Sequence, residues 1–313
     1  MAFKRVPQKF KAAIAEVTLG TGDKAVVIGG NDTFPLYAFD APVKNRTAVG
    51  LEITDAGVDK SIPGIAAIFE GCDTLAAQAA KAATLPGVDF LAVRLENADP
   101  NGEDMPIEDC VKICKEICDA IDIPMVVEGC KNNEKDAKIF SAVAEALAGK
   151  NVLFMSAHED NHKNIAASVG LANNQKVGAE SAVDINLAKQ LNVLLNQMGV
   201  KNEGIVMNVG SAAAGYGFEY VVSTMDRVLA AALAQDDKQL QMPIITPVAG
   251  EAWGVKEAIV SEADFPEWGP AEERGINMEV ATAASCMAAG SNAVILKHPK
   301  SVQTIAELVS ALI

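Results

Sequence analysis

The sequence is poor in aromatic residues, in histidine and in positive charge. Aromatic residues make up 5% of the 313 residues, there are 3 histidines, and 26 Lys and Arg stand against 41 Asp and Glu. The resulting net charge of −15 argues against binding to a phosphate backbone or an anionic lipid surface through the overall field of the protein. We therefore expect no nucleic acid and no membrane among its partners.

Export signals and long apolar runs are also missing. The first ten residues include three basic side chains but no apolar stretch of the length that a secretory signal needs. The uncharged run at 280–296 is interrupted by Gly290, Ser291 and Asn292, which predicts the end of a helix followed by a strand and not a membrane span. Six cysteines in such a chain indicate free thiols in a reducing compartment. We expect a cytoplasmic protein.

The chain does contain a regular alternation of short β-branched runs with longer stretches of helical periodicity. Strands are predicted at 47–53, 90–95, 125–128, 152–156, 176–179, 204–209, 243–246 and 293–296. Helices are predicted near 72–84, 107–121, 134–148, 162–171, 185–198, 218–234, 276–289 and 302–313. Eight strand-then-helix units with apolar strands predict an α/β fold of the (β/α)8 TIM-barrel type. A doubly wound open sheet is the alternative, but it would have fewer strands and an early glycine turn that opens a helix.

Residues 1–46 do not follow this alternation and form a predicted N-terminal extension, with the barrel over 47–313. Within the extension, two short apolar runs at 17–19 and 26–28 predict a β-hairpin that closes the N-terminal end of the barrel. The segment 20–25 imitates the G-x-G-x-x-A pattern of dinucleotide-binding loops. A strand follows it where such a loop needs a helix, so we predict a turn.

A TIM barrel places its function in the loops that follow the strands. Polar residues in these loops are predicted at Asp55, Glu96, Asn97, Glu128, His158, Glu159, Asp160, Glu180, Asn208 and Thr246. The longest loop, 250–275, holds Trp253, Trp268 and seven acidic residues. Loops of this length are typical of lids and partner surfaces.

The segment His158–His162 matches the H-E-x-x-H pattern of zinc hydrolases. Here the first histidine follows a strand directly, so the helical spacing that places both histidines on one metal is not assured. An overlapping Asp160-x-His162 pair is similar to a corrinoid-binding signature that lacks its glycine in this chain. The ordinary interpretation is that Asp160 caps the following helix.

Three cysteines, Cys110, Cys114 and Cys118, are spaced as in some iron-sulfur ligand sets. They fall on one helical stripe together with Ile107 and Ile121. The cysteines span about 12 Å of helix, which is too long for one small cluster to bridge. We predict small buried hydrophobic side chains and no cluster in this chain.

The loop 210–220 is rich in glycine and small side chains, with a strand before it and a long helix after it. Close approach of another molecule to the backbone and free amides at the helix start would suit an anionic or amide-bearing ligand. Tight packing of the loop on the helix is the alternative interpretation. The chain shows no P-loop, serine nucleophile elbow or Cys-His dyad.

Several segments together carry a family resemblance. They are Val26-Val27-Ile28-Gly29-Gly30 with Phe34-Pro35-Leu36, Gly215-Tyr216-Gly217-Phe218-Glu219-Tyr220 with Ser223-Thr224-Met225-Asp226-Arg227, and Trp253 with Lys256-Glu257-Ala258. This combination, from about residue 15 to the C-terminus, resembles the small (delta) subunit of the corrinoid iron-sulfur protein, the methyl carrier of the reductive acetyl-CoA pathway.

The resemblance implies a barrel subunit of a heterodimer. Its large subunit would carry the iron-sulfur cluster and hold cobalamin, which would lie between the two subunits. The corrinoid would take a methyl group from methyltetrahydrofolate on a separate methyltransferase and give it to CO dehydrogenase/acetyl-CoA synthase. This chain would then cap and position the corrinoid as a carrier subunit without a catalytic residue or metal site of its own.

Corrinoid contacts are expected in the loops after three strands. The residues are Asn208, Gly210, Ser211, Gly215, Gly217, His158, Glu159, Asp160, Thr246, Glu251 and Trp253. The alternative function is a stand-alone pterin-binding barrel that transfers the methyl group itself. In that case Asp55, Glu96, Asn97 and Asn208 would converge on the pterin ring. A third possibility is a barrel kept only as an assembly scaffold.

Overall fold

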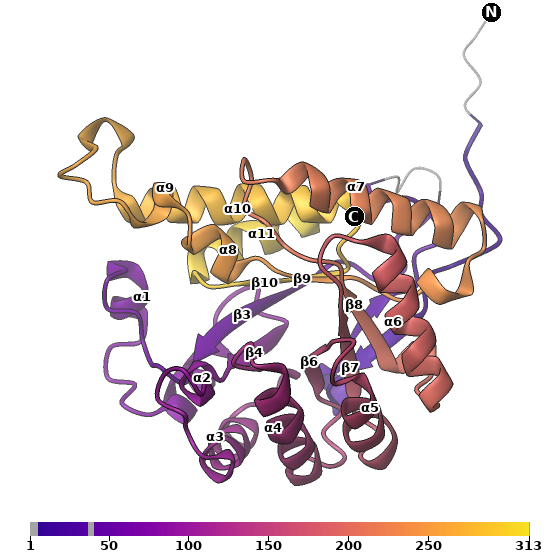
Figure 1. Cartoon of the computed structure of the whole chain (residues 1–313). Coiled ribbons are helices and arrows are strands. Elements are labelled where there is room, and N and C mark those ends of the chain that lie inside the picture. The colour runs from indigo at the N-terminus through magenta and orange to yellow at the C-terminus, as the bar shows by residue number, and fades with distance from the viewer. Residues whose placement is uncertain (1–5, 37–40, 313) are drawn as a thin grey trace, which may run out of the picture.

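Eight parallel strands, each followed by helical structure, form the centre of the molecule (Figure 1). The computed structural model describes residues 6–36 and 41–312. In spatial order the sheet runs β8-β7-β6-β5-β4-β3-β10-β9. The strands are β3 (Ala48–Thr54), β4 (Phe90–Arg94), β5 (Met125–Glu128), β6 (Leu153–Ala157), β7 (Lys176–Glu180), β8 (Ile205–Asn208), β9 (Ile245–Pro247) and β10 (Ala293–Leu296).

The two ends of this sheet meet between β8 and β9. A parallel bridge pairs Met207 with Ile244, and the amide of Met207 donates to the carbonyl of Pro243 at 2.8 Å. This contact brings the sheet round into a barrel, so the predicted TIM barrel is confirmed.

Helices cover the outside of the barrel (Figure 1). They are α1 (Pro63–Ile68), α2 (Leu75–Ala82), α3 (Ile107–Ala120), α4 (Asn133–Ala146), α5 (His162–Ile165), α6 (Ile185–Met198), α7 (Phe218–Leu229), α8 (Ala249–Trp253), α9 (Lys256–Ile259), α10 (Ala271–Ala289) and α11 (Pro299–Ala311). Two π-helical segments, Ala166–Ala172 and Ala230–Ala234, continue α5 and α7. No helix within the described ranges is long and apolar enough to cross a membrane.

Local sequence signals account for these elements. The side chain of Asp184 accepts from the amides of Asn186 and Leu187 at the start of α6, and the helix ends at Gly199 with a φ of 108°. Along α3, Cys110 and Cys114 are fully buried against the barrel. The helical stripe predicted from the cysteine spacing is thus confirmed at these two positions, and all six cysteines are free.

An antiparallel hairpin of β1 (Glu16–Leu19) and β2 (Val26–Gly29) closes the N-terminal end of the barrel. Val17, Leu19 and Ile28 are completely buried and pack with the inward-facing side chains of the barrel strands. The predicted hairpin is confirmed, and a short 3₁₀ turn, Gly22–Lys24, lies between its strands. The glycine-rich segment before β2 is therefore a turn, as predicted.

The barrel interior is tightly filled next to the hairpin. A Cβ atom on Gly50 of β3 would overlap the ring of Phe90, which is fully buried at the start of β4. The glycine at this position lets the aromatic ring fill the barrel axis. The barrel axis is therefore filled by side chains at this end.

The predicted long loop 250–275 is a folded arm that projects from the barrel beside α10 (Figure 1). It contains the end of α8, all of α9 and a 3₁₀ turn, Pro266–Trp268. The guanidinium of Arg274 donates to three backbone carbonyls of the arm, at Glu257 (2.6 Å), Gly269 (2.5 Å) and Val260. The side chain of Arg274 thus connects three backbone positions of the arm.

Candidate functional site

Charged side chains replace apolar ones where the strands reach the carboxyl end of the barrel. Glu52 on β3, Arg94 on β4 and Glu128 on β5 lie on three neighbouring strands, and Glu52 and Arg94 occupy successive inward positions after Gly50 and Ala92. Nη2 of Arg94 lies 2.9 Å from Oε2 of Glu52 and 3.0 Å from Oε2 of Glu128. One guanidinium is therefore shared by two carboxylates.

The three side chains are almost completely withdrawn from solvent, with exposed fractions of 8% for Glu52, 12% for Arg94 and 9% for Glu128. Burial, followed by repulsion from Glu128, raises the pKa of Glu52 to about 8. Burial alone would lower the pKa of Arg94, but the carboxylates of Glu128 and Glu52 outweigh it and raise that pKa above its ordinary value. Burial and the neighbouring carboxyl group of Glu128 therefore favour the protonated form of Glu52.

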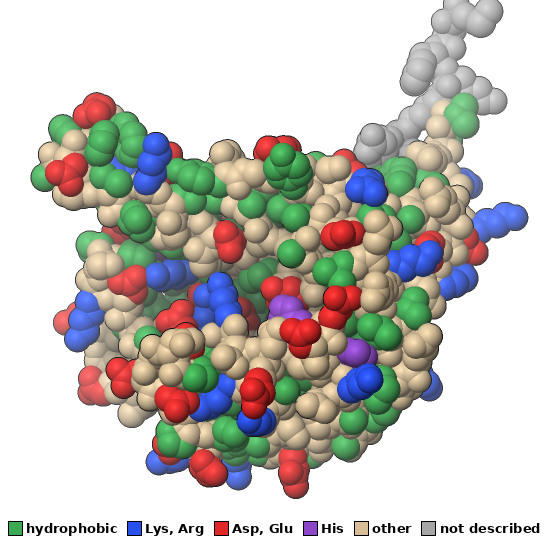
Figure 2. Space-filling model, in the orientation of Figure 1, with side chains coloured by type: hydrophobic (Ala, Val, Ile, Leu, Met, Phe, Trp, Pro, Cys, Tyr) green, Lys and Arg blue, Asp and Glu red, His purple; other side chains and the backbone are tan. Residues whose placement is uncertain are grey.

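A pocket of about 340 Å³ lies above this cluster, and we call it the mouth pocket. It contains groups of both charges, and Figure 2 shows acidic, basic and histidine side chains around a hollow on this face. Its lining residues are Arg94, Glu128, Gly129, Lys131, Asn133, Asp136, Met155, Ser156, His158, Glu180, Asn208, Gly210, Ser211, Pro247, Gly250 and Glu251.

Three polar atoms in the wall of the mouth pocket are buried and lack a hydrogen-bond partner within residues 6–36 and 41–312. They are Oε1 of Glu128, Oγ of Ser156 and Oγ of Ser211. Buried polar groups in folded proteins are nearly always paired. Within the described residues, these three atoms in the wall of the mouth pocket are exceptions to this rule.

Five residues predicted as corrinoid contacts line the mouth pocket: His158, Asn208, Gly210, Ser211 and Glu251. They come from the loops after β6, β8 and β9, which the structure brings together. Nε2 of His158 lies 3.8 Å from Oε2 of Glu180. Oδ1 of Asn208 accepts from the amide of Gly210 at 3.1 Å.

Four other predicted contacts lie away from this pocket. The hydroxyl of Thr246 is fully buried and lies 2.5 Å from the hydroxyl of Ser291. Trp253 stacks on His298 with their ring centroids 5.8 Å apart. Gly215 and Gly217 have φ angles of 87° and 82° in the loop before α7. Their role as ligand contacts stays a prediction.

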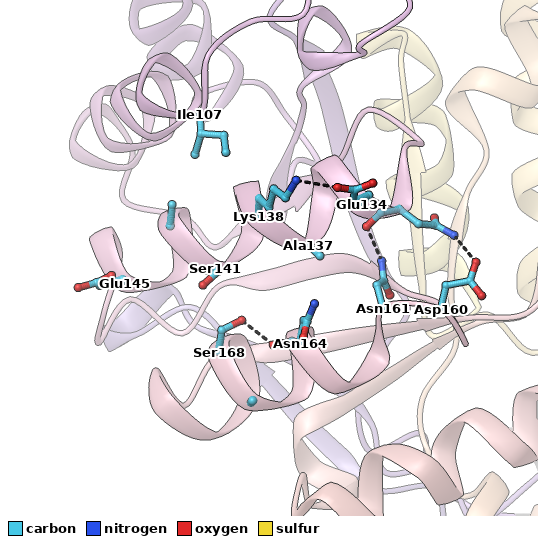
Figure 3. Close-up of a pocket in the computed structure, with 13 residues that line it drawn as sticks. Ile107, Glu134, Ala137, Lys138, Ser141, Glu145, Asp160, Asn161, Asn164 and Ser168 are labelled. Atoms are coloured by element: carbon cyan, nitrogen blue, oxygen red, sulfur yellow. Dashed lines mark hydrogen bonds and ion pairs between the residues drawn. The ribbon is translucent and has the colours of Figure 1, made fainter.

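The remaining two, Glu159 and Asp160, are exposed at the start of α5. Asp160 lines a larger groove of about 780 Å³ between α4 and α5, on the outside of the barrel, where its carboxylate accepts a 3.4 Å bond from Asn133 (Figure 3). The prediction that Asp160 caps the helix is wrong: Asn161 holds the N-cap position, and neither side chain bonds to the first-turn amides. The Oδ1 atom of Asn161 instead accepts from the amide of His158 at 2.7 Å.

The structure also separates the two histidines of the H-E-x-x-H segment. His158 lines the mouth pocket, whereas His162 is buried in α5 with Nδ1 2.7 Å from the carbonyl of Glu159. Over the described part of the chain, no group of three or more His, Cys, Asp or Glu side chains is arranged to hold a metal ion.

Sequence reasoning missed Glu52, Arg94 and Ser156. The available signal was a charge at an inward position of an otherwise apolar strand, repeated on the adjacent strand. Ser156 gave no such signal, because it depends on a register shift in β6 between Phe154 and Ala157.

The polar residues considered for pterin binding largely bond to one another. The backbone amide of Asn97 donates to Oδ1 of Asp55 at 3.0 Å, and its side-chain amide donates to the carbonyl of Asp55 at 3.1 Å. Glu96 accepts from the hydroxyl of Thr54 at 3.0 Å. Of the four residues in that hypothesis, Asn208 alone lines the mouth pocket.

The architecture places this chain among TIM-barrel proteins with the fold of dihydropteroate synthase. The enzyme of Xanthomonas albilineans, solved with 4-aminobenzoic acid, superposes with a TM-score of 0.56 at 12% identity, covering 95% of this chain and 98% of that one. The Yersinia pestis enzyme superposes with a TM-score of 0.53 at 12% identity, covering 85% and 93%. At these identities the likeness concerns the fold alone.

Sequence comparison identifies the family. A family model described as CO dehydrogenase/acetyl-CoA synthase delta subunit matches residues 16–307. Acetyl-CoA decarbonylase/synthase complex subunit delta 2 of Methanosarcina acetivorans is 30% identical over 297 residues, or 94% of this chain and 67% of that protein. Subunit delta of Methanothermobacter thermautotrophicus is 31% identical over 306 residues, or 96% and 76%. The chain belongs to the CO dehydrogenase/acetyl-CoA synthase delta subunit family.

Proposed function

We propose that this chain is the small subunit of a cytoplasmic corrinoid iron-sulfur methyl carrier, and that its barrel mouth caps the cobalamin held by a larger subunit. Family membership supports a role as a subunit of an acetyl-CoA-forming or acetyl-CoA-cleaving complex. The methyl group would come from methyltetrahydrofolate on a separate methyltransferase and go to acetyl-CoA synthase. The chain itself would contribute binding and shielding.

The observation that carries this proposal is the mouth pocket with its three unpartnered polar atoms. A barrel kept only as a scaffold would have no need for buried hydroxyl and carboxylate oxygens that the protein leaves without partners. The opposite end of the barrel is filled by the hairpin, which leaves the carboxyl end as the face for a ligand.

The residues at the mouth fit the periphery of a corrinoid. The amide side chains of such a cofactor require short polar partners, which Ser156, Ser211 and Asn208 provide. A volume of about 340 Å³ is near the lower end of the range for pockets that enclose a small organic ligand. A corrinoid ring would therefore lie over the opening and would not enter it.

When bound, the cobalt of the corrinoid would carry the methyl group. The chain's own residues would keep bulk water from that face. Arg94 lies between the carboxyl groups of Glu52 and Glu128. The lining as a whole holds Arg94 and Lys131 against Glu128, Asp136, Glu180 and Glu251, so the covered face would be acidic and would disfavour an anion.

Co-expression with a corrinoid-bearing large subunit from the same operon or genome tests the proposal. We expect a heterodimer that retains corrinoid absorption and buries more than about 2,000 Å² in total. Glu251→Arg, at the exposed rim of the mouth pocket, should weaken the heterodimer about tenfold or more. The matched variant Asp122→Arg, exposed at the hairpin end where Asp122 pairs with Lys24, should leave it unchanged.

The opposite pattern, with loss of pairing only in Asp122→Arg, would show that the subunits dock through the hairpin end. Methyl transfer from methyltetrahydrofolate to free cob(I)alamin by this chain alone would instead support the stand-alone methyltransferase. Neither result is expected, because the hairpin fills the N-terminal end of the barrel and because, of the four residues considered for pterin binding, Asn208 alone lines the mouth pocket.

A further inference from the structure

We propose that the arm, residues 250–275, is a docking element for a second protein that binds transiently, and that this partner carries an apolar cleft with a rim of Lys and Arg side chains. The side chains that enter the cleft would be those of Ile259 and Phe265. The acidic residues that flank them are Glu262, Asp264 and Glu267. The inference goes beyond the proposed function, on which it rests only for the choice of proteins to test.

The outer part of the arm exposes apolar side chains that take no part in the core. Ile259 is 68% exposed and Phe265 is 38% exposed, and Figure 2 shows hydrophobic side chains at the projecting end of the arm. Within the described residues, neither side chain belongs to an apolar cluster, whereas Val255 and Ala258 at the base of the arm pack with Ala213. Exposed apolar side chains gathered on one projecting element are typical of surfaces that bind other proteins.

The arm presents these side chains on a fixed framework. The guanidinium of Arg274 connects three of its backbone carbonyls. Nearer the tip, the ring of Phe265 stacks on Trp268 with the centroids 4.5 Å apart, and Oε1 of Glu262 accepts from the amide of Ala271 at 2.9 Å. A partner would therefore bind a preformed shape and would lose little affinity to the ordering of the arm.

The three acidic side chains that flank the apolar ones have no cationic partner. Among residues 6–36 and 41–312, none of these carboxylates takes part in a salt bridge. The two cations of the arm contact an aromatic ring, since Nζ of Lys256 and the guanidinium of Arg274 each lie 5.9 Å from the ring centroid of Trp268. The unbalanced negative charge of the arm therefore complements a partner surface rich in Lys and Arg.

The same charge disfavours other occupants. Nucleic acid and anionic lipid would be repelled by the three carboxylates. A second copy of this chain has a net charge of −15 and presents an identical acidic arm, so pairing of two arms would bring like charges together. A different protein with a basic rim avoids both kinds of repulsion.

The small size of the apolar surface indicates a transient complex and not a permanent subunit. A fully enclosed aromatic side chain buries about 150–250 Å². At their exposed fractions, Ile259 and Phe265 together offer on the order of 200 Å². A stable interface buries about 800 Å² on each partner. The arm alone therefore fits the weak, reversible contact that lets a carrier release each protein it visits.

Binding of two purified proteins from the same genome tests the inference. The methyltetrahydrofolate methyltransferase and the acetyl-CoA synthase are titrated by biolayer interferometry against this immobilised chain, with and without its large subunit. At 50 mM salt, Phe265→Ser should weaken the binding of at least one of them about tenfold or more. Leu171→Ser is the matched control, because Leu171 is 48% exposed but belongs to the π-helical segment after α5. It should change neither affinity by more than about twofold.

A second pair of variants tests the charge. Asp264→Asn combined with Glu267→Gln should weaken the same complex about three- to tenfold at 50 mM salt. The difference should shrink at 500 mM salt, because salt screens exposed charges. The matched control, Glu108→Gln with Asp119→Asn, removes two exposed acidic groups from α3 and should leave the affinity unchanged. Glu262 is kept, because its carboxylate also bonds to the backbone of the arm.

Loss of heterodimer formation in Phe265→Ser would mean that the arm holds the permanent subunit, and loss of self-association would mean that it pairs with a second copy. Either result would overturn the inference. Failure of both proteins to bind, equal effects of Phe265→Ser and Leu171→Ser, or no effect of the charge variants would overturn it as well.

Corrinoid retention by the heterodimer is measured separately. If the heterodimer retains corrinoid while the arm variants have no effect, the docking element is wrong and the proposed function stands. If no heterodimer forms while Phe265→Ser still weakens binding to this chain alone, the docking element stands and the proposed function is wrong.

Discussion

The two ends of the barrel are built by the same strands and have opposite properties. At the N-terminal end, Val17, Leu19 and Ile28 of the hairpin fill the axis with apolar side chains. At the carboxyl end, Glu52 and Arg94 continue the same inward-facing rows with charge. The comparison shows that the apolar packing and the charged mouth of the barrel are divided along one axis, a few residues apart on each strand.

Removal of Arg94 should have the largest effect at the mouth. Arg94→Met leaves Glu52 and Glu128 buried together without a counter-charge. We expect a loss of about 3–5 kcal/mol in the free energy of unfolding at pH 7, measured by urea denaturation. A loss below about 1 kcal/mol would mean that the two carboxyl groups do not depend on Arg94.

Truncation of a buried hairpin side chain should lower the free energy of unfolding nearly as much as Arg94→Met does, and it should leave the mouth pocket unchanged. Leu19→Ala removes a fully buried side chain from the sealed end and should cost about 2–4 kcal/mol. Thr18→Ala, on the exposed side of the same strand, is the control and should change stability by about 0.5 kcal/mol or less. Below the unfolding transition, Leu19→Ala should form the heterodimer with the large subunit as the unmodified chain does. Weakened pairing would show that the two ends of the barrel are coupled.

The pH dependence of the free energy of unfolding should depend on the carboxyl end of the barrel, where Glu52 lies. Because the pKa of Glu52 is raised from 4.5 to about 8, the folded chain retains a proton that the unfolded chain releases between these values. The contribution of Glu52 to stability therefore falls as pH rises through this window. As the pH rises from 5 to 9, the free energy of unfolding of Glu52→Gln should increase by about 1–3 kcal/mol relative to that of the unmodified chain. A constant difference between the two proteins across this range would contradict the raised pKa.

The smallest effect is expected from a substitution between the barrel and its helices, away from both ends of the barrel. Burial raises the pKa of the Cys114 thiol, so this thiol should stay unmodified by Ellman's reagent in the folded chain. Cys114→Ala should cost about 1 kcal/mol of stability and leave heterodimer formation unchanged. Stoichiometric iron and sulfide in the anaerobically purified chain would contradict a purely structural role for the helix cysteines.

Much of the fold was predictable because it depends on local patterns. Apolar β-branched runs and helical periodicity identified all eight barrel strands and the hairpin, with ends displaced by at most two residues. The segment 250–275 was less predictable. Its shape depends on Arg274 and its contacts with backbone carbonyls up to 17 positions away, which no local pattern encodes.

The site was only half predictable, for a related reason. His158, Asn208 and Glu251 follow strands, and loop position alone identifies such residues. Glu52 and Arg94 lie within strands, and their importance depends on which neighbours the barrel places beside them. Thr246 lies within β9 beside Ser291 and Trp253 lies at the end of α8 beside His298, outside the mouth pocket, and their role as ligand contacts stays a prediction.

The anchoring of the arm by Arg274 has a consequence for how this protein can evolve. All three acceptors of its guanidinium are main-chain carbonyls, which every residue possesses. Exposed side chains of the arm that take no part in this anchoring, such as Ile259, can therefore be exchanged without loss of its shape, as long as the arginine remains. Recognition of different partner surfaces could then diversify between lineages on an unchanged backbone.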